Sequence, residues 1–242
     1  LTVSGAFTLT GNADLNGDLD VDGTTNLDVV DIDGALTQDG GAVFNEAGAD
    51  VDFRVETSGN QNMLFVDAGS NHISIGTGTD YDAVLNVLST DNNKTLSLVS
   101  TDTDANAGPV LALTRQSSSS AADGDVLGRV DFEGLNDANQ QVAYGRMQTF
   151  IRDASDGSED GTVQINHIIA GTERVALELD NDEYVFNNAG IDIDFRVESS
   201  GNANMLFVDS GNDRVGIGTT TTNSILHAAT SGTGSIPTGQ FN

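Results

Sequence analysis

The chain has 242 residues, and its 37 acidic and 9 basic side chains give a formal net charge of −28. A surface this acidic repels phosphate backbones and anionic membrane surfaces, which argues against nucleic-acid and membrane partners. Cysteine is absent, which excludes disulfides, thiolate chemistry and cysteine-ligated metals. No apolar run of about 18 residues occurs, so no membrane-spanning helix is predicted. The hydrophobic content of 37%, without Trp, is low for one deep core.

Residues 1–42 carry a six-residue repeat that predicts a β-shaft. Two alternating apolar positions follow the first glycines of the repeat, and a period of two places both on one strand face. Such short units cannot bury their apolar face alone, so the repeat predicts either a single-chain β-helix or three chains wrapped together. Three chains are favoured because each unit offers only two inward residues, and the repeat is expected to continue upstream of Leu1. The repeated glycines are Gly5, Gly11, Gly17 and Gly23.

Residues 43–77 and 185–219 are two copies of one module. They align without a gap at an offset of 142, and 24 of the 35 positions are identical. Alternating apolar residues predict three strands in the first copy, at 51–56, 62–66 and 72–75, separated by Gly-, Asn- and Asp-rich turns. Three strands of about five residues are too few to be stable alone, so the module is expected to need a partner chain or a neighbouring module. The residues predicted to carry strand packing or chain-to-chain contact are Phe53, Val55, Leu64 and Val66, with Phe195, Val197, Leu206 and Val208.

The central segment, residues 92–183, has longer alternating runs separated by polar turns. This pattern predicts an antiparallel sandwich or a barrel-like domain, and this segment is the one expected to hold a core of its own. No long stretch with a helical period is present, so helix is expected to be scarce. The predicted strands are 95–100, 110–114, 126–132, 142–151, 162–169 and 174–179.

The duplicated module resembles repeats in fibre proteins of tailed bacteriophages, especially marine ones. The resemblance rests on Asp52-Phe53-Arg54-Val55-Glu56, on Asn62-Met63-Leu64-Phe65-Val66-Asp67 and on Ile75-Gly76-Thr77. The second copy ends in 214–220, which is similar to the step before the later domains of many phage tail fibres.

Two further stretches, 121–128 and 156–161, resemble a domain of such fibres. The resemblance covers most of 43–220 and implies a parallel homotrimer on the virion, as a tail, neck or capsid fibre. Many members of this group end in an autoproteolytic folding domain, but nothing in 221–242 matches one, so that activity is not carried over.

The predicted fold is therefore all-β, an elongated homotrimeric fibre. The expected parts are a hexad-repeat β-shaft (1–42), the first module with a connector (43–91), the central antiparallel domain (92–183), the second module (184–222) and a C-terminal tail or linker (223–242).

Asp18, Asp20 and Asp22, followed by Gly23, have the opening spacing of a calcium loop. An EF-hand places a bidentate Glu at the twelfth position, and that position is Val29 here. The neighbouring Leu19 and Val21 fit the inward face of the hexad, so the three Asp are interpreted as solvated acids on the outer face. A weak cation between neighbouring chains is the alternative.

No catalytic constellation is predicted. With 37 acids, carboxylate pairs carry no information about glycan hydrolysis, and aromatic platforms are few, with Tyr81, Tyr144 and Tyr184 and no Trp. The histidines His72, His167 and His227 are far apart in sequence, and Arg214 takes the place of His72 in the second copy. The tract 117–120 is four serines, interpreted as a flexible loop, and Gly216-Ile217-Gly218 lacks the third glycine and the helix of a phosphate cradle.

These observations predict a non-enzymatic structural segment of a virion fibre that positions a host-contact surface, without cofactor or metal. Its expected partners are two further copies of itself, other virion proteins and a host surface receptor, and its expected location is the surface of the particle. The alternatives are a bacterial surface adhesin or extracellular filament, a capsid decoration protein and a tailspike glycan depolymerase.

Overall fold

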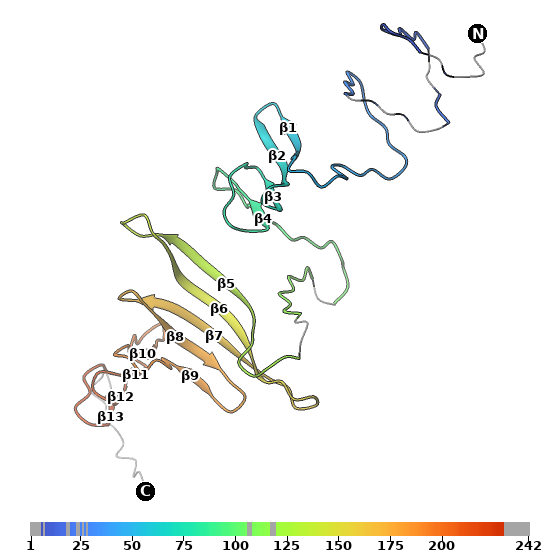
Figure 1. Cartoon of the computed structure of the whole chain (residues 1–242). Coiled ribbons are helices and arrows are strands. Elements are labelled where there is room, and N and C mark those ends of the chain that lie inside the picture. Colours follow the sequence, from blue (N-terminus) through green and yellow to red (C-terminus); the bar gives the residue numbers. More distant parts are fainter. Residues whose placement is uncertain are drawn as a thin grey trace. The chain divides into compact units, whose positions relative to one another are not determined.

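The structure is a computed structural model of the whole chain, and it describes residues 6, 8–17, 20–22, 25, 27, 29–105, 108–116 and 120–229 (Figure 1). The chain divides into two compact units, Leu1–Leu98 and Val99–Asn242. Every regular element among the described residues is a β-strand, and none is a helix. The predicted all-β class is confirmed.

The described residues before Phe53 contain no strand. A strand needs a neighbour with which to exchange backbone hydrogen bonds, and no ladder forms among these residues within one chain. Their apolar side chains, such as Leu9, Leu15 and Leu36, are exposed. The β-shaft over 1–42 stays a prediction. Several of its positions lie outside the described residues: Leu1, Val3, Gly5, Phe7, Asp18, Leu19 and Gly23.

The first module forms a four-stranded sheet in the order β1 (Phe53–Thr57), β2 (Asn60–Asp67), β3 (His72–Ile75) and β4 (Leu85–Val87). The pairs β1–β2 and β2–β3 are antiparallel, and β4 is parallel to β3. The three predicted strands are confirmed. The fourth strand was not predicted, and the chain reaches it through a crossover formed by residues 76–84.

The second module repeats this sheet with β10 (Phe195–Val197), β11 (Leu206–Asp209), β12 (Arg214–Ile217) and β13 (Leu226–Ala228). The pairing of Phe195 with Val208 matches that of Phe53 with Val66, and β13 is again parallel to β12. Because two separate units reach the same strand order and register, the module sequence specifies its own sheet.

The central segment forms one antiparallel sheet in chain order, made of β5 (Val126–Leu135), β6 (Gln141–Asp153), β7 (Asp160–Ile169), β8 (Thr172–Leu179) and β9 (Tyr184–Phe186). The last four predicted strands are confirmed. The predicted strands at 95–100 and 110–114 are wrong, because the described residues there enter no ladder. The predicted sandwich or barrel is also wrong within one chain, since these five strands form a single open sheet.

A hydrophobic core is nearly absent from the described part of the chain. Phe207, with 8% of its surface exposed, is the one buried hydrophobic residue there, and no side chain is fully buried. The core expected in the central segment does not form within one chain, so the apolar side chains remain available for contact.

Candidate assembly surface

One face of the first module's sheet consists of apolar side chains. Phe53 lies opposite Val66 and Val55 lies opposite Leu64, so these four side chains share a face. Strands β3 and β4 extend the same face, and its residues on β3, β4 and at Val55 are exposed. We call this the first module face; it comprises Phe53, Val55, Leu64, Val66, Ile73, Ile75, Leu85 and Val87.

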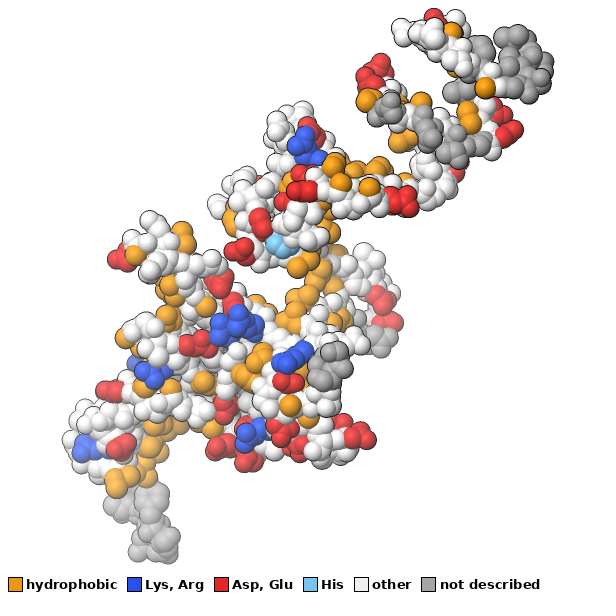
Figure 2. All heavy atoms as spheres, in the orientation of Figure 1, with side chains coloured by type: hydrophobic (Ala, Val, Ile, Leu, Met, Phe, Trp, Pro, Cys, Tyr) orange, Lys and Arg blue, Asp and Glu red, His pale blue; other side chains and the backbone are white. Residues whose placement is uncertain are grey.

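The second module carries the same surface. Its registers place the corresponding apolar residues on one face, and Val197, Ile217 and Leu226 on it are exposed. Figure 2 shows hydrophobic side chains among those at the surface of the chain. We call this the second module face; it comprises Phe195, Val197, Leu206, Val208, Val215, Ile217, Leu226 and Ala228.

Each module face is extended by an aromatic pair of its own. Phe44 lies against Phe53 with ring centroids 4.9 Å apart, and Phe186 lies against Phe195 at 5.0 Å. A turn at positive φ brings the first ring of each pair into place, at Asn45 (φ 59°) and Asn187 (φ 60°). The side-chain amide of Asn187 also donates to the Ile191 carbonyl (2.7 Å), and Asn45 donates to Ala49 in the same way.

The opposite face of each module is closed by its own crossover. In the first module Ser74 and Asn86 are 4% and 5% exposed, and the Asn86 amide donates to the carbonyl of Ala83 in the crossover (3.0 Å). In the second module the hydroxyl of Thr222 donates to Asp209 (2.9 Å) beside the buried Phe207. Each module therefore has one covered face and one open apolar face.

The position held by His72 and Arg214 joins a strand to the crossover in both copies. The Nδ1 atom of His72 lies 2.9 Å from a carboxylate oxygen of Asp80, and Arg214 donates from its guanidinium to the carbonyl of Thr222. Two different side chains thus make equivalent links. This arrangement agrees with the interpretation of the position as a structural one, exchangeable between copies.

The carboxylates whose pKa values depart from normal are structural. The pKa of Asp67 is lowered, first by the backbone N–H of Ser70, which donates to its carboxylate (2.9 Å). The pKa of Asp209 is lowered by the side-chain amide of Asn212 and then by the hydroxyl of Thr222. Both carboxylates accept hydrogen bonds from residues three positions along the chain, and these bonds stabilise the turns between strands.

The remaining candidates from the sequence are not brought together. Asp20 and Asp22 are exposed outside any strand, and Asp18 and 117–119 lie outside the described residues. His167 lies in β7 and His227 in β13, whereas Gly216 and Gly218 flank the end of β12 with no helix after them. The described part of the chain holds no group of three His, Cys, Asp or Glu side chains placed to bind a metal ion.

The residues predicted from the sequence make up four of the eight in each module face. The other four, on β3 and β4 and on β12 and β13, were not predicted. The signal for the fourth strand was the pair Val84-Leu85 with Ile225-Leu226. These pairs are offset by 141 residues, whereas the two 35-residue copies are offset by 142. An alignment without gaps therefore does not include them.

No helix in the described residues has the length and apolar character needed to cross a membrane. Comparison with protein-family models and with curated proteins finds no match to this chain.

Proposed function

We propose that this chain is a non-catalytic structural segment of a virion fibre, assembled as a homotrimer. The observation that carries the proposal is the open apolar face of eight residues that occurs in both modules while the opposite face is closed. A contiguous exposed apolar face of this kind marks a surface at which a soluble protein meets another protein.

The partner that best suits these faces is the same chain. Most soluble oligomers are closed assemblies of identical subunits, and a surface repeated along the chain gives each copy several equivalent contacts with its neighbours. The resemblance to fibres of tailed phages supports three parallel copies. The hexad repeat supports the same number, because each unit supplies only two inward residues.

In this assembly the chain acts as a spacer and support. The turns and crossovers, with their carboxylates hydrogen-bonded to turn residues, face solvent and keep the fibre soluble. The fibre positions a host-contact surface away from the particle, whether it is attached at the tail, the neck or the capsid.

The first test is the mass of the purified protein in solution. Sedimentation equilibrium at micromolar concentration is expected to give three times the chain mass of 25.1 kDa, with resistance to dissociation by SDS. A clean monomer would overturn the homotrimer. Immunogold labelling of virus particles tests the location, and label that is absent from every fibre would overturn the virion assignment.

A further inference from the structure

The two faces of the five-stranded central sheet are chemically different. On one face Arg129, Gln148, Gln164 and Glu178 lie in one register row across four strands. The side-chain amide of Gln148 donates to Gln164 (3.0 Å), and Gln164 donates to Glu178 (2.5 Å). Hydrogen bonds within this polar row therefore join three of its four side chains.

Ion pairs complete the polar face. Arg146 pairs with Asp131 (2.6 Å) and with Glu173 (2.9 Å), and Arg129 pairs with the same Asp131 (2.9 Å). The Asn166 amide adds a hydrogen bond to Glu173 (2.6 Å). Most charges and amides of this face are therefore paired within the sheet, which suits contact with water, whereas the buried Oδ1 atom of Asn166 has no hydrogen-bond partner among the described residues.

The other face presents a continuous apolar surface. One register row supplies an apolar side chain from each of the five strands, and the row beside it adds three more. All eight except Leu177, which is half-buried, are exposed. We call this the central apolar face; it comprises Val130, Met147, Ile165, Leu177 and Phe186 in the first row and Val163, Leu179 and Tyr184 in the second.

The size of the central apolar face suits a contact that is shared with neighbouring surfaces. Five strands spaced about 4.8 Å apart span about 24 Å, and two rows of same-face residues, each about 7 Å deep, span about 14 Å, so the face covers about 330 Å². Two such faces together cover about 650 Å², which is below the range of specific interfaces, about 1,200–2,000 Å². A stable contact between copies therefore combines this face with other surfaces of the chain, such as the module faces.

The charge pattern indicates which partner fits. The chain carries −28, yet the two apolar rows contain no carboxylate. A basic partner would be drawn to the acidic surfaces elsewhere on the chain. Two copies that met through those surfaces would repel each other, whereas two central apolar faces can meet without opposing carboxylates.

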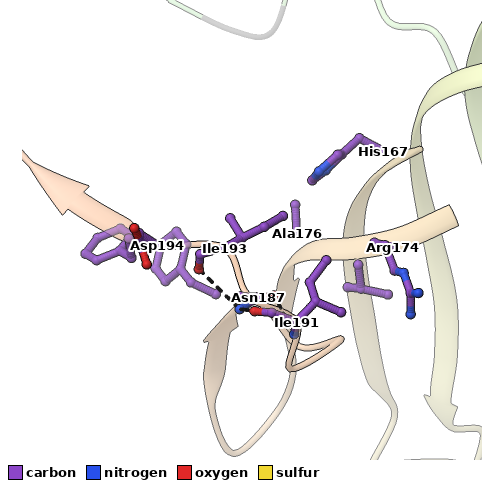
Figure 3. A pocket seen from close by; sticks show the side chains of 10 residues that line it. His167, Arg174, Ala176, Asn187, Ile191, Ile193 and Asp194 are labelled. Carbon is purple, nitrogen blue, oxygen red and sulfur yellow. Dashed lines mark hydrogen bonds between the residues drawn. The ribbon is translucent and has the colours of Figure 1, made fainter. Parts of the chain in front are cut away.

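The edge of this face holds an unused polar group. Phe132, Gly145, His167 and Arg174 form the next register row, and the Nε atom of Arg174 is buried with no hydrogen-bond partner among the described residues. Arg174 and His167 line a hollow of about 100 Å³ that also contains Phe186 and Phe195, where the sheet meets the second module (Figure 3). A buried Arg donor without an acceptor is costly, so this edge of the face is less well satisfied than the polar rows.

We propose that the central apolar face packs against the same sheet of neighbouring copies, so that the core missing from one chain forms between chains, with the polar face outward. This inference rests on the proposed homotrimer and assigns it a further surface, which meets the second module face at the Phe186–Phe195 pair. Sheets packed face to face lie about 10 Å apart, the distance at which apolar side chains interdigitate.

The test adds one negative charge to either face of the same strand. Met147→Glu places a carboxylate on the central apolar face, and Gln148→Glu places one on the polar face, opposite Arg129. At micromolar concentration, Met147→Glu is expected to raise the dissociation constant of the assembly at least tenfold, whereas Gln148→Glu leaves it within about twofold. Far-ultraviolet circular dichroism checks that both variants keep their strands.

The possible outcomes separate the two proposals. If the wild type is a trimer and Met147→Glu remains one of equal affinity, the central interface is wrong and the homotrimer stands. If the wild type is a monomer, the homotrimer itself fails. Equal loss of assembly in both variants would also overturn the assignment of the face.

A second experiment does not depend on a disruptive substitution. The chain has no cysteine, so a single introduced cysteine can be cross-linked only to another copy. With a short bismaleimide, Ile165→Cys is expected to yield mainly covalently linked chains, whereas its neighbour Gln164→Cys on the polar face stays mainly single. Equal yields from the two positions would overturn the proposal.

Discussion

At the scale of single residues, Gly76 shows how the module imposes a backbone shape. Gly76 begins the first crossover with φ at +83°, and a Cβ atom there would lie 2.6 Å from the carbonyl oxygen of Leu88. Because both the dihedral angle and the space exclude a side chain, Gly76→Ala is expected to lower the free energy of unfolding by about 1–3 kcal/mol. Urea denaturation followed by circular dichroism measures the change.

The matched control is Gly59→Ala in the turn between β1 and β2. A Cβ at Gly59 meets nothing within 4 Å, so this substitution is expected to change stability by less than about 0.5 kcal/mol. Equal stability of the two variants would show that the crossover does not hold its shape in solution.

Asp209 gives a prediction about pH at the same scale. Its pKa is lowered from 3.8 by hydrogen bonds from Asn212 and Thr222, so the ionised carboxylate favours the folded state. This contribution is fully present above pH 3.8, and it is lost as the pH falls through the lowered folded-state pKa. Asp209→Asn is therefore expected to be less stable than the wild type at pH 7 and to approach it below pH 3.8. Melting curves from pH 2 to pH 7 test this, and a constant difference across that range would contradict it.

At the scale of elements, the sequence predicted strands wherever two faces of a sheet differ. In the stretch from Phe53 to Glu56, apolar and charged residues alternate, and β1 forms there. The fourth strand of each module was not predicted, because β4 and β13 have only three residues each. Each is reached through a crossover and pairs in parallel with the preceding strand. A three-residue run carries too little periodicity to be recognised alone.

Whether the remaining apolar runs form strands depends on the presence of a neighbouring strand. Residues 42–44 align with Tyr184–Phe186, but only the second set forms a strand, β9, because β8 lies beside it and pairs with it. The runs at 95–100 and 110–114 alternate as well as β5 does, yet no strand within the described residues pairs with them. Alternation shows that a segment suits a sheet, whereas a strand forms only where a neighbour supplies hydrogen bonds.

Only the part of the first module face that lies in the β1–β2 hairpin could be predicted from the sequence. Phe53, Val55, Leu64 and Val66 lie in a hairpin, where a short turn fixes the register and therefore the shared face. The contribution of Leu85 and Val87 depends on the path of the crossover, which the sequence pattern does not specify.

At the scale of the whole molecule, apolar association and electrostatic repulsion oppose each other. All three sheets present an open apolar face, and each chain carries −28, so three chains carry 3 × −28, or −84. The module faces and the central apolar face are nearly free of acidic groups. The electrostatic repulsion between chains therefore acts mainly between acidic surfaces that remain in solvent. Salt should therefore weaken the repulsion while leaving the apolar contacts in place.

The expected result is an assembly whose melting temperature rises with sodium chloride between about 10 mM and about 500 mM, as the Debye length falls from about 30 Å to below about 8 Å. The effect should shrink near pH 4, because protonation of carboxylates in acid removes much of the negative charge. Differential scanning calorimetry at both pH values, at fixed chain concentration, measures both effects. A melting temperature that fell with salt at pH 7 would mean that ion pairs between chains, rather than apolar faces, hold the assembly together.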